Sequence, residues 1–597
     1  MQYNWSIRHL TAVEQELQQQ LERELNISSA AARMLVVRGI QTADEARAFV
    51  RPSLDKLHDP FLMRDMDKAV ERLHRAIAQN EKILIYGDYD VDGTTAVALM
   101  YRFLAGVQSP IADCQSPNID YYIPDRYTEG YGVSTQGIDY AAEQGCNLII
   151  TLDCGIKAVE KVAYANSKGI DVIVCDHHTP GDTLPDAVAV LNMKRSDCPY
   201  PYKDLSGCGV GFKLAQAYTQ RYLIEANGNE AKGNEAIRLS GERLLPLTQL
   251  LAMSIASDIV PITGENRILA HFGIQQLNKA PFTGVSAIMQ VAGIEAKKLT
   301  INDLVYRIGP RINACGRMKS GRAAVELLLT NDPVFARQQA EEVNQNNEDR
   351  RDCDTETTKE ALLQLQDDPT YAERRSTVVY APHWHKGVVG IVASRLTETY
   401  YRPTIVLTAG ENGIISGSAR SVGGFDIYAA IDSCHDLLTN FGGHKYAAGL
   451  SMHINDLPAF RERFEAYVAA HIQPNQLQPT LEIEAEIQLG DITKSFYNVL
   501  RHLEPFGPGN PRPLFVSRRL INHRDTRAVG KEREHLRLDV TDRQNAITGI
   551  AFGRADMAEY IQNGNAVDIC YELNENTFNH YTTIQMMVQD IQPCSVN

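Results

Sequence analysis

The feature that most constrains the fold is a set of short apolar segments that end in acidic residues. Three of them are "KILIYGD" (82–88), "NLIITLD" (147–153) and "DVIVCDHH" (171–178), and "AVAVLN" (187–192) follows. Segments with helical spacing, such as "GIDYAAEQG" and "KAVEKVAYANSKG", lie between them. Because strands that alternate with helices form βαβ units, the sequence predicts an α/β fold built on a parallel sheet.

Potential metal ligands stand where the predicted strands and one apolar helical run, "LLAMSIAS", come to an end. They are Asp88, Asp90 and Asp92; Asp153; Asp176, His177 and His178; and Asp258. In open α/β sheets the ligand site lies at the carboxyl ends of the strands. We therefore expect segments that are distant in the sequence to converge on one crevice.

The chemistry of this cluster follows from its charge. Crowded carboxylates raise one another's pKa values, so the cluster is tolerable only with bound cations. Oxygen and imidazole donors without thiolates suit manganese or magnesium and allow zinc or cobalt. Two such ions, about 3.5–4 Å apart, can activate water for in-line phosphoryl displacement. Each motif alone also fits a calcium loop, a helix cap or a structural histidine pair, and only the combination predicts a two-metal hydrolytic site.

Composition sets further limits. The chain has 597 residues, which predicts three or four domains, and its hydrophobic content of 44% is ordinary for a globular protein. No apolar run reaches the roughly 18 residues of a membrane span, and the N-terminus lacks a signal-peptide pattern. Eleven cysteines without CxxC pairs predict reduced thiols in the cytoplasm. The net charge of −15 disfavours nucleic acid as a partner, but local fields and bound metals count for more than the total.

The rest of the chain divides by pattern. We predict a helical N-terminal segment (1–78), the parallel-sheet domain (79–334), a long connecting helix (335–370), a smaller α/β domain (371–455) and a β-rich C-terminal domain (456–597). The last block has five or six alternating strands, which fit a small barrel of the OB type, a fold that binds single strands. Its basic residues, proposed to bind nucleic acid, are Arg518, Arg519, Arg524, Arg527, Lys531 and Arg533.

The motifs then resemble a known family. "YGDYDVDGTTA", "TLDCGI" and "CDHHTP" are similar, in order, to the motifs of the DHH phosphoesterase superfamily. "YYIPDRYTEGYG", "LSGCGVGFKLAQA", "SIASDIVPITGENR" and "GPRINACGRM" resemble those of its RecJ branch of single-strand-specific exonucleases. Related pyrophosphatases carry a histidine where this chain has Tyr86, which favours the RecJ branch and leaves the ligand set of the first metal open.

The resemblance implies roles for the site residues. The metal ligands would be Asp88, Asp90, Asp92, Asp153, His177 and Asp258. His178 would lie nearer the substrate phosphate, and Asp176 would orient the histidine pair. The smaller α/β domain resembles the DHH-associated substrate domain. Residues expected to contact phosphate are Arg126, either Arg311 or Arg317, Ser418, Arg420, Gly442, Gly443 and His444.

The predicted function is a metal-dependent exonuclease that degrades single-stranded DNA. Family resemblance implies 5′-to-3′ polarity, mononucleotide products, roles in recombination and repair, two divalent ions with manganese preferred over magnesium, and a single-strand-binding protein and a helicase as partners. We expect a monomer. The alternatives are a DHH enzyme acting on oligonucleotides, cyclic dinucleotides or pyrophosphate, and a scaffold that binds single strands without catalysis. The basic C-terminal domain counts against the first alternative, and the complete set of acids counts against the second.

Overall fold

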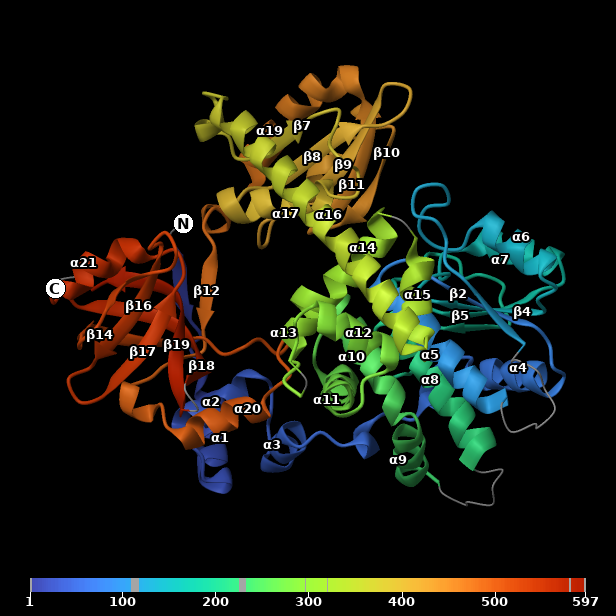
Figure 1. The fold of residues 1–597 in the computed structure, drawn as a ribbon, viewed down its shortest axis with the longest axis horizontal. Coiled ribbons are helices and arrows are strands. Elements are labelled where there is room, and N and C mark those ends of the chain that lie inside the picture. The colour runs from blue at the N-terminus through green and yellow to red at the C-terminus, as the bar shows by residue number, and fades with distance from the viewer. Residues whose placement is uncertain are drawn as a thin grey trace. The chain divides into compact units, whose positions relative to one another are not determined.

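The computed structural model describes residues 3–108, 118–224, 232–295, 297–318, 320–578 and 581–594. The chain forms two compact units. The sheet unit consists of Arg47–Glu348 and His502–Arg512, and the barrel unit consists of Met1–Ala46, Asp349–Arg501 and Pro513–Asn597. Figure 1 labels the helices and strands of both units.

The sheet unit is built on a five-stranded parallel sheet with the order β3-β2-β4-β5-β6. Its strands are β2 (Ile83–Gly87), β3 (Ile119–Tyr122), β4 (Leu148–Leu152), β5 (Asp171–Cys175) and β6 (Ala189–Leu191). The central strands β2 and β4 are buried along their whole length, as expected when helices cover both faces of a parallel sheet. The predicted parallel α/β fold is confirmed. The short edge strand β3 was missed because only four residues form it.

Helices cover both faces of this sheet (Figure 1). One face packs on α4 (Met66–Ala78), α5 (Val91–Gln108) and α8 (Gly207–Tyr218) in a large apolar core. The other face packs on α6 (Thr135–Glu143) and α7 (Val159–Ser167) in a smaller core. The large core continues into a helical region that carries three of the predicted site residues, Asp258, Arg311 and Arg317. Its helices are α9 (Asn234–Arg243), α10 (Thr248–Ser257), α11 (Gly264–Lys279), α12 (Thr283–Val291), α13 (Ile301–Asp303), α14 (Gly309–Met318) and α15 (Gly321–Leu329).

The predicted connecting helix is observed as α16 (Pro333–Gln366). It is followed by a mixed five-stranded sheet with the order β10-β11-β9-β8-β7. Its strands are β7 (Thr377–Tyr380), β8 (Thr404–Ala409), β9 (Ile414–Arg420), β10 (Asn440–His444) and β11 (Ala447–His453). One face packs on α17 (Val389–Tyr400) and the other on α18 (Ile427–Asp432) and α19 (Leu457–His471). Because Phe460 and Phe464 of α19 are part of this core, the domain extends beyond the predicted boundary at residue 455.

The C-terminal strands form a barrel. The ring β14-β18-β19-β17-β16 is closed by a second pairing between β14 and β16, so five strands enclose the core, as in an OB-fold. The strands of the ring are β14 (Phe515–Asn522), β16 (His535–Thr541), β17 (Ala546–Ala551), β18 (Val567–Phe578) and β19 (Tyr581–Pro593). The short strands β13 (Ala485–Glu486) and β15 (Arg527–Val529) extend the sheet, and α20 (Lys494–His502) and α21 (Ala558–Gln562) flank it.

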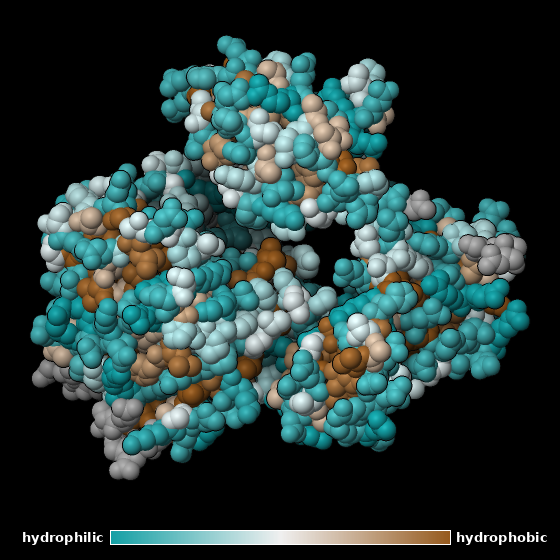
Figure 2. All heavy atoms as spheres, turned by 180° about the vertical axis from the view of Figure 1, so that it is seen from behind, coloured by the Kyte–Doolittle hydropathy of each residue, from teal (hydrophilic) through white to brown (hydrophobic). Residues whose placement is uncertain are grey.

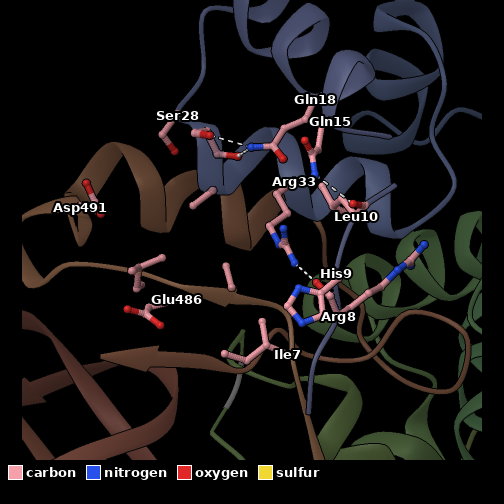
Figure 3. A pocket seen from close by; sticks show the side chains of 14 residues that line it. Ile7, Arg8, His9, Leu10, Gln15, Gln18, Ser28, Arg33, Glu486 and Asp491 are labelled. Carbon is pink, nitrogen blue, oxygen red and sulfur yellow. Dashed lines mark hydrogen bonds between the residues drawn. The ribbon is translucent and has the colours of Figure 1, made fainter. Parts of the chain in front are cut away.

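The N-terminal segment is divided between the units and does not form one helical region over residues 1–78. Strand β1 (Asn4–Ile7) pairs in parallel with β12 (Thr480–Ile483) and adds Trp5 and Ile7 to an apolar cluster of the barrel unit. Helices α1 (Ala12–Leu25), α2 (Ser29–Val37) and α3 (Ala43–Val50) follow. A pocket of about 550 Å³ lies between α1, α2 and β13, and Figure 3 shows Arg33 reaching the backbone of Arg8 within it.

The surface is mainly polar on the face drawn in Figure 2, and apolar side chains gather there only in scattered patches. Within the described ranges, every helix is too short or too polar to pass through a bilayer. The ten cysteines in the described part of the chain are all free.

Candidate metal centre

The candidate site lies at the carboxyl edge of the parallel sheet. The loops after β2, β4 and β5 carry most of the predicted acids and both histidines. Asp92 lies in the first turn of α5, and Asp258 caps the carboxyl end of α10. Three groups with possible ligand atoms within 4.8 Å of one another lie here: Asp88, Asp90 and Asp153; Asp92, His177 and Asp258; and Asp153, His177 and His178. The expected convergence is therefore present in the structure.

His177 has a defined tautomer. Its Nδ1 lies 3.1 Å from the carbonyl oxygen of Leu205, which fixes the ring proton on Nδ1. Nε2 then presents a lone pair to carboxylate oxygens of Asp153 at 3.2 Å, Asp258 at 3.6 Å and Asp92 at 4.0 Å. Burial lowers the pKa of His177, so the ring stays neutral. Because a nitrogen lone pair and carboxylate oxygens that face one another repel, this arrangement is typical of a site that binds a cation.

Asp92 is held rigidly by helix α8. The backbone N–H groups of Gly207 and Cys208 donate to its two carboxylate oxygens at 2.7 and 2.8 Å, and Ser254 Oγ donates to Oδ1 at 2.7 Å. The first turn of a helix carries free N–H groups and a partial positive charge, so it favours an anion there. Asp92 thus keeps its carboxylate fixed within the cluster.

Asp153 has an unusual backbone. Its φ of 61° lies in the left-handed region, which non-glycine residues adopt rarely and often at functional sites. Helix α8 approaches it so closely that a Cβ atom on Gly207 would lie 2.5 Å from Cβ of Asp153 and 2.8 Å from its Cα. A glycine is therefore required at position 207. Gly207 lies in the motif "LSGCGVGFKLAQA", but no pattern in the sequence indicated its contact with Asp153.

His178 and Asp176 form a hydrogen-bonded pair. Asp176 Oδ1 accepts from the backbone N–H of His178 at 3.0 Å and lies 2.8 Å from Nδ1 of its ring. Asp176 Oδ2 accepts from the N–H of Ile156 at 2.9 Å. Burial alone would raise the pKa of Asp176, but these hydrogen bonds hold it below its ordinary value. Burial opposes protonation of His178, yet the bond to Asp176 raises its pKa. The His178 side chain is 42% exposed, so its ring faces the solvent side of the cluster.

Tyr131 completes this side of the site. Its hydroxyl donates to the backbone carbonyl of Asp153 at 3.1 Å and lies 3.1 Å from Nδ1 of His178. Tyr131 belongs to the quoted motif "YIPDRYTEGYG", but nothing in the sequence indicated its contact with the second histidine. Tyr86 points elsewhere, because its hydroxyl bonds to Gly132 and Ser134.

The electrostatics of the cluster call for bound cations. Burial, followed by the charge of Asp90, raises the pKa of Asp88 to about 8, and burial, followed by the charge of Asp92, raises that of Asp258 to about 9. Burial and neighbouring carboxylates also hold the pKa of Asp153 well above its ordinary value. Among the described residues, Asp88 Oδ1, Asp153 Oδ1 and His177 Nε2 are buried without a hydrogen-bond partner. Orphaned acceptors of this kind fit manganese or magnesium.

Three predicted arginines lie in the sheet unit. The guanidinium of Arg126 stacks over the ring of Tyr89 at 4.9 Å, beside the acidic loop. Both Arg126 and Arg317 are close enough to lower the pKa of Tyr89, which burial and Asp88 raise to about 12. Arg311 instead donates to Asn344 Oδ1 at 3.0 Å and to the carbonyl of Arg307 at 2.6 Å.

The remaining phosphate-contact candidates lie on the mixed sheet. A Cβ atom on Gly390, in the first turn of α17, would lie 3.1 Å from Arg420 Nη2 and 3.3 Å from Ser418 Oγ, so both side chains flank the start of that helix. Gly442, Gly443 and His444 lie together at the exposed end of β10. Gly443 has a φ of 152°, and a Cβ there would meet the backbone of Ala448 at 2.5 Å.

The basic residues of the barrel divide into two groups. Arg518 pairs with Glu486 at 2.8 Å and Asp568 at 2.7 Å, and Arg527 pairs with Asp525. The others are exposed and have no ion pair with any residue in the described ranges: Arg519, Arg524, Lys531 and Arg533. Sequence proximity could not distinguish these groups, because the pairing acids of Arg518 come from distant strands.

A parallel sheet with an aspartate and histidine cluster at its carboxyl edge defines the class of metal-dependent phosphoesterases to which the DHH proteins belong. Residues 82–237 match the DHH family, N-terminal domain; residues 375–470 match the DHHA1 domain; and residues 483–590 match the RecJ OB domain.

Relatives with similar sequences narrow this class. The chain is 34% identical over 578 residues to the single-stranded-DNA-specific exonuclease RecJ of Bacillus subtilis, covering 97% of this chain and 70% of the relative. It is 33% identical over 573 residues to RecJ of Escherichia coli, covering 94% of this chain and 95% of the relative. The crystal structure of Thermus thermophilus RecJ in complex with Mn²⁺ superposes with a TM-score of 0.80 at 26% identity, covering 100% of this chain and 80% of that one. The chain belongs to the RecJ family of single-stranded-DNA-specific exonucleases.

Proposed function

We propose that this protein is a metal-dependent exonuclease that degrades single-stranded DNA from its 5′ end and releases mononucleotides, in recombination and repair. The observation that carries the proposal is the cluster of buried, unpartnered acceptor atoms at the carboxyl edge of the sheet, in a chain of the RecJ family. The barrel at the C-terminus, with its exposed basic residues, supports a nucleic acid as the substrate.

The acidic cluster would hold two divalent cations, with manganese preferred over magnesium. Asp88, Asp90 and Asp153 would hold one, and Asp92, His177 and Asp258 the other, with Asp153 close to both groups. When bound, the cations supply an activated water and offset the charge that develops on the phosphate. The backbone conformation of Asp153 and the hydrogen bonds from α8 to Asp92 keep these donors in place before the substrate binds.

The protonated His178 would donate a hydrogen bond to the substrate phosphate. Asp176 favours this role, because it keeps the His178 ring oriented and stabilises its charged form. A fixed cationic donor that meets a phosphoryl group as negative charge develops lowers the barrier to hydrolysis. We expect His178 to contribute to catalysis and His177 to metal binding.

Further groups would bind the phosphates of the strand. Arg126 and Arg317 are favoured beside the metal cluster, because Arg311 is already hydrogen-bonded to Asn344 and to a backbone carbonyl. On the mixed sheet, the terminal phosphate would be bound by Ser418, Arg420 and the segment Gly442 to His444. Arg420 would donate two hydrogen bonds to it from its guanidinium group. The exposed barrel residues Arg519, Arg524, Lys531 and Arg533 would follow the backbone of the single strand.

We infer a cytoplasmic location and a monomeric protein that works with a single-strand-binding protein and a helicase. The free cysteines of the described residues support a reducing compartment.

The test is digestion of 5′-labelled and 3′-labelled single-stranded DNA in the presence of manganese. We expect immediate release of the 5′ label as a mononucleotide. Asp153→Ala should lose manganese binding and at least 1,000-fold of the activity, whereas His178→Ala should lose a similar factor with manganese affinity retained. Asp139→Ala, which removes an exposed acid of the same unit, is the matched control and should behave as the wild type.

Two results would contradict the proposal. Activity that survives Asp153→Ala would mean that the cluster is not the catalytic site. Cleavage of dinucleotides without digestion of long strands would indicate a small-substrate phosphodiesterase of the DHH class instead.

A further inference from the structure

Ile259 has a backbone conformation that its side chain strongly disfavours. It directly follows Asp258, the residue that caps α10, and its φ is 58°. In this left-handed region the Cβ atom of an L-residue crowds the following carbonyl, and a β-branched residue there is a genuine outlier. The position after a helix cap is usually glycine or asparagine, which take this conformation at little cost.

The chain on both sides enforces the turn. Before it, Asp258 Oδ2 lies 3.6 Å from His177 Nε2 in the metal cluster. After it, Val260 and Ile262 are buried, the N–H of Ile262 donates to the carbonyl of Pro508 at 2.7 Å, and the hydroxyl of Tyr202 donates to the carbonyl of Pro261 at 3.1 Å. These anchors hold residue 259 in a left-handed turn, whichever side chain it carries.

Packing does not explain why this residue is an isoleucine, since its side chain is 71% exposed. A strained backbone and an exposed apolar side chain are both costs, and here they coincide beside a metal ligand. A second exposed residue of this region, Tyr131, is 55% exposed and contacts His178 through its hydroxyl. The rings of His177 and His178 are 4.5 Å apart, and Asp258, which directly precedes Ile259, lies beside the first of them.

We propose that Ile259 contacts the substrate and contributes to its selection: its side chain packs against the face of the base attached to the phosphate that is cleaved. This inference rests on the proposed function. An unpaired 5′ base can turn a face toward an apolar side chain, whereas the 5′ base of a duplex is held in place by its paired base and its stacked neighbour. The contact therefore favours single strands, and its apolar character tolerates every base.

The experiment compares Ile259→Gly and Ile259→Asn with the wild type, using a 5′-labelled single-stranded oligodeoxynucleotide and manganese. Both substitutions suit the left-handed turn, so we expect the melting temperature to rise by about 2–4 °C. We expect KM to rise about 10-fold, the typical scale of one lost stacking contact, with kcat within about twofold and manganese affinity unchanged. Lys297→Gly is the matched control, since Lys297 is also exposed with a φ of 67°, and it should leave KM unchanged.

A second substrate identifies the group that is contacted. An oligodeoxynucleotide whose 5′ nucleotide lacks its base should have a raised KM with the wild type, and Ile259→Gly should add little to that increase, because both changes remove the same contact. An unchanged KM for Ile259→Gly would overturn the inference, as would independent effects of the two changes. A loss of manganese affinity equal to the loss of activity would also overturn it, because Ile259 would then act only through Asp258. Failure of the wild type to digest the strand would instead refute the proposed function.

Discussion

Gly207 lies where helix α8 meets Asp153, the aspartate that lies close to both groups of candidate metal donors. A Cβ atom at this position would lie 2.6 Å from Asp153 Oδ1 and 2.8 Å from Cα of the same residue, so the backbone itself would have to move. We expect Gly207→Ala to cost about 1–3 kcal/mol of stability through overpacking. We also expect manganese affinity to fall at least 10-fold and exonuclease activity at least 100-fold, because a displacement near 1 Å misplaces the catalytic groups.

Titration with manganese and thermal unfolding measure these effects. Gly106→Ala is the control, since a Cβ at this position in α5 meets no atom within 4 Å, and it should leave affinity unchanged. Wild-type manganese affinity in Gly207→Ala would show that the contact between α8 and Asp153 has no part in holding the metal donors.

The raised carboxyl pKa values couple metal binding to protons. The pKa is about 8 for Asp88 and about 9 for Asp258, whereas an unfolded aspartate titrates near 4. Between these values the metal-free folded protein binds more protons than the unfolded chain. Its stability should therefore decrease as pH rises from about 4 to about 9. Manganese must displace these protons, so its affinity should increase over the same range.

Calorimetric titration at pH 7 in two buffers of different ionisation enthalpy tests this coupling. We expect release of at least one proton for each protein molecule that is saturated with manganese. Binding without proton release would show that Asp88 and Asp258 are already ionised in the metal-free protein.

At the scale of single residues, the sequence predicted the acids and histidines that meet, because the carboxyl ends of parallel strands share one edge of a sheet. It did not predict Gly207, Tyr131 or the left-handed turns at Asp153 and Ile259. These features depend on contacts between residues far apart in the chain, and no local pattern of side chains encodes such distances.

Among the elements, helices α8 and α10 together fix Asp92. The buried hydroxyl of Ser254 on α10 donates to Asp92 Oδ1 at 2.7 Å and lies 2.6 Å from Ser206 Oγ, which caps α8. Ser254→Ala should cost about 1.5–3 kcal/mol, the usual value for a buried hydrogen bond to a charged group. Manganese affinity should fall by a smaller factor than in Gly207→Ala, because the two backbone donors remain.

Ser257→Ala provides a matched comparison one turn later on the same helix. Its hydroxyl is buried and has no hydrogen-bond partner among the described residues. Its removal should therefore not destabilise the protein, because no hydrogen bond is lost and an unsatisfied polar group is removed. Chemical denaturation of both variants measures the difference. Equal losses of stability in the two variants would show that the bond from Ser254 to Asp92 is not the cause of the loss.

The elements themselves were largely predictable. Helix α4 and the central strands were predicted from amphipathic or buried runs, because periodicity and burial act over many residues. Helix α16 was predicted from a long polar stretch that is low in glycine and proline. The four-residue strands β1 and β3 were missed, since both are stabilised by partners elsewhere: β1 pairs with β12, more than 470 positions away, and β3 lies at a sheet edge. Helix α19 was assigned to the wrong domain for the same reason, because its apolar face packs on a sheet that precedes it.

For the whole molecule, the net charge of −15 is compatible with binding a polyanion. Several acids form the candidate metal centre, where bound cations would offset them, and others pair with arginines within each unit. Four exposed basic residues of the barrel form no such pair with any residue in the described ranges: Arg519, Arg524, Lys531 and Arg533. The local distribution of charge, and not the net charge of the chain, decides where a negatively charged strand can bind.

The division into two units leads to a prediction about unfolding. All the candidate metal ligands belong to the sheet unit, whereas β1 belongs to the barrel unit. We expect two calorimetric transitions. Manganese at 100 times its dissociation constant should stabilise only the transition of the sheet unit, by about 2.7 kcal/mol. Trp5→Ala should lower only the stability of the barrel unit, by about 2–3 kcal/mol. The substitution removes a half-buried ring and the hydrogen bond from Trp5 Nε1 to Asp590 at 2.9 Å.

Val13→Ala, at an exposed position of α1, is the control and should move neither transition. If one transition responded to both manganese and Trp5→Ala, the units would unfold as a single cooperative block. In that case the N-terminal strand would stabilise the metal centre as well, although it contributes no ligand. If the two responses stay separate, the metal centre depends only on the residues of the sheet unit, and the barrel unit acts on the substrate alone.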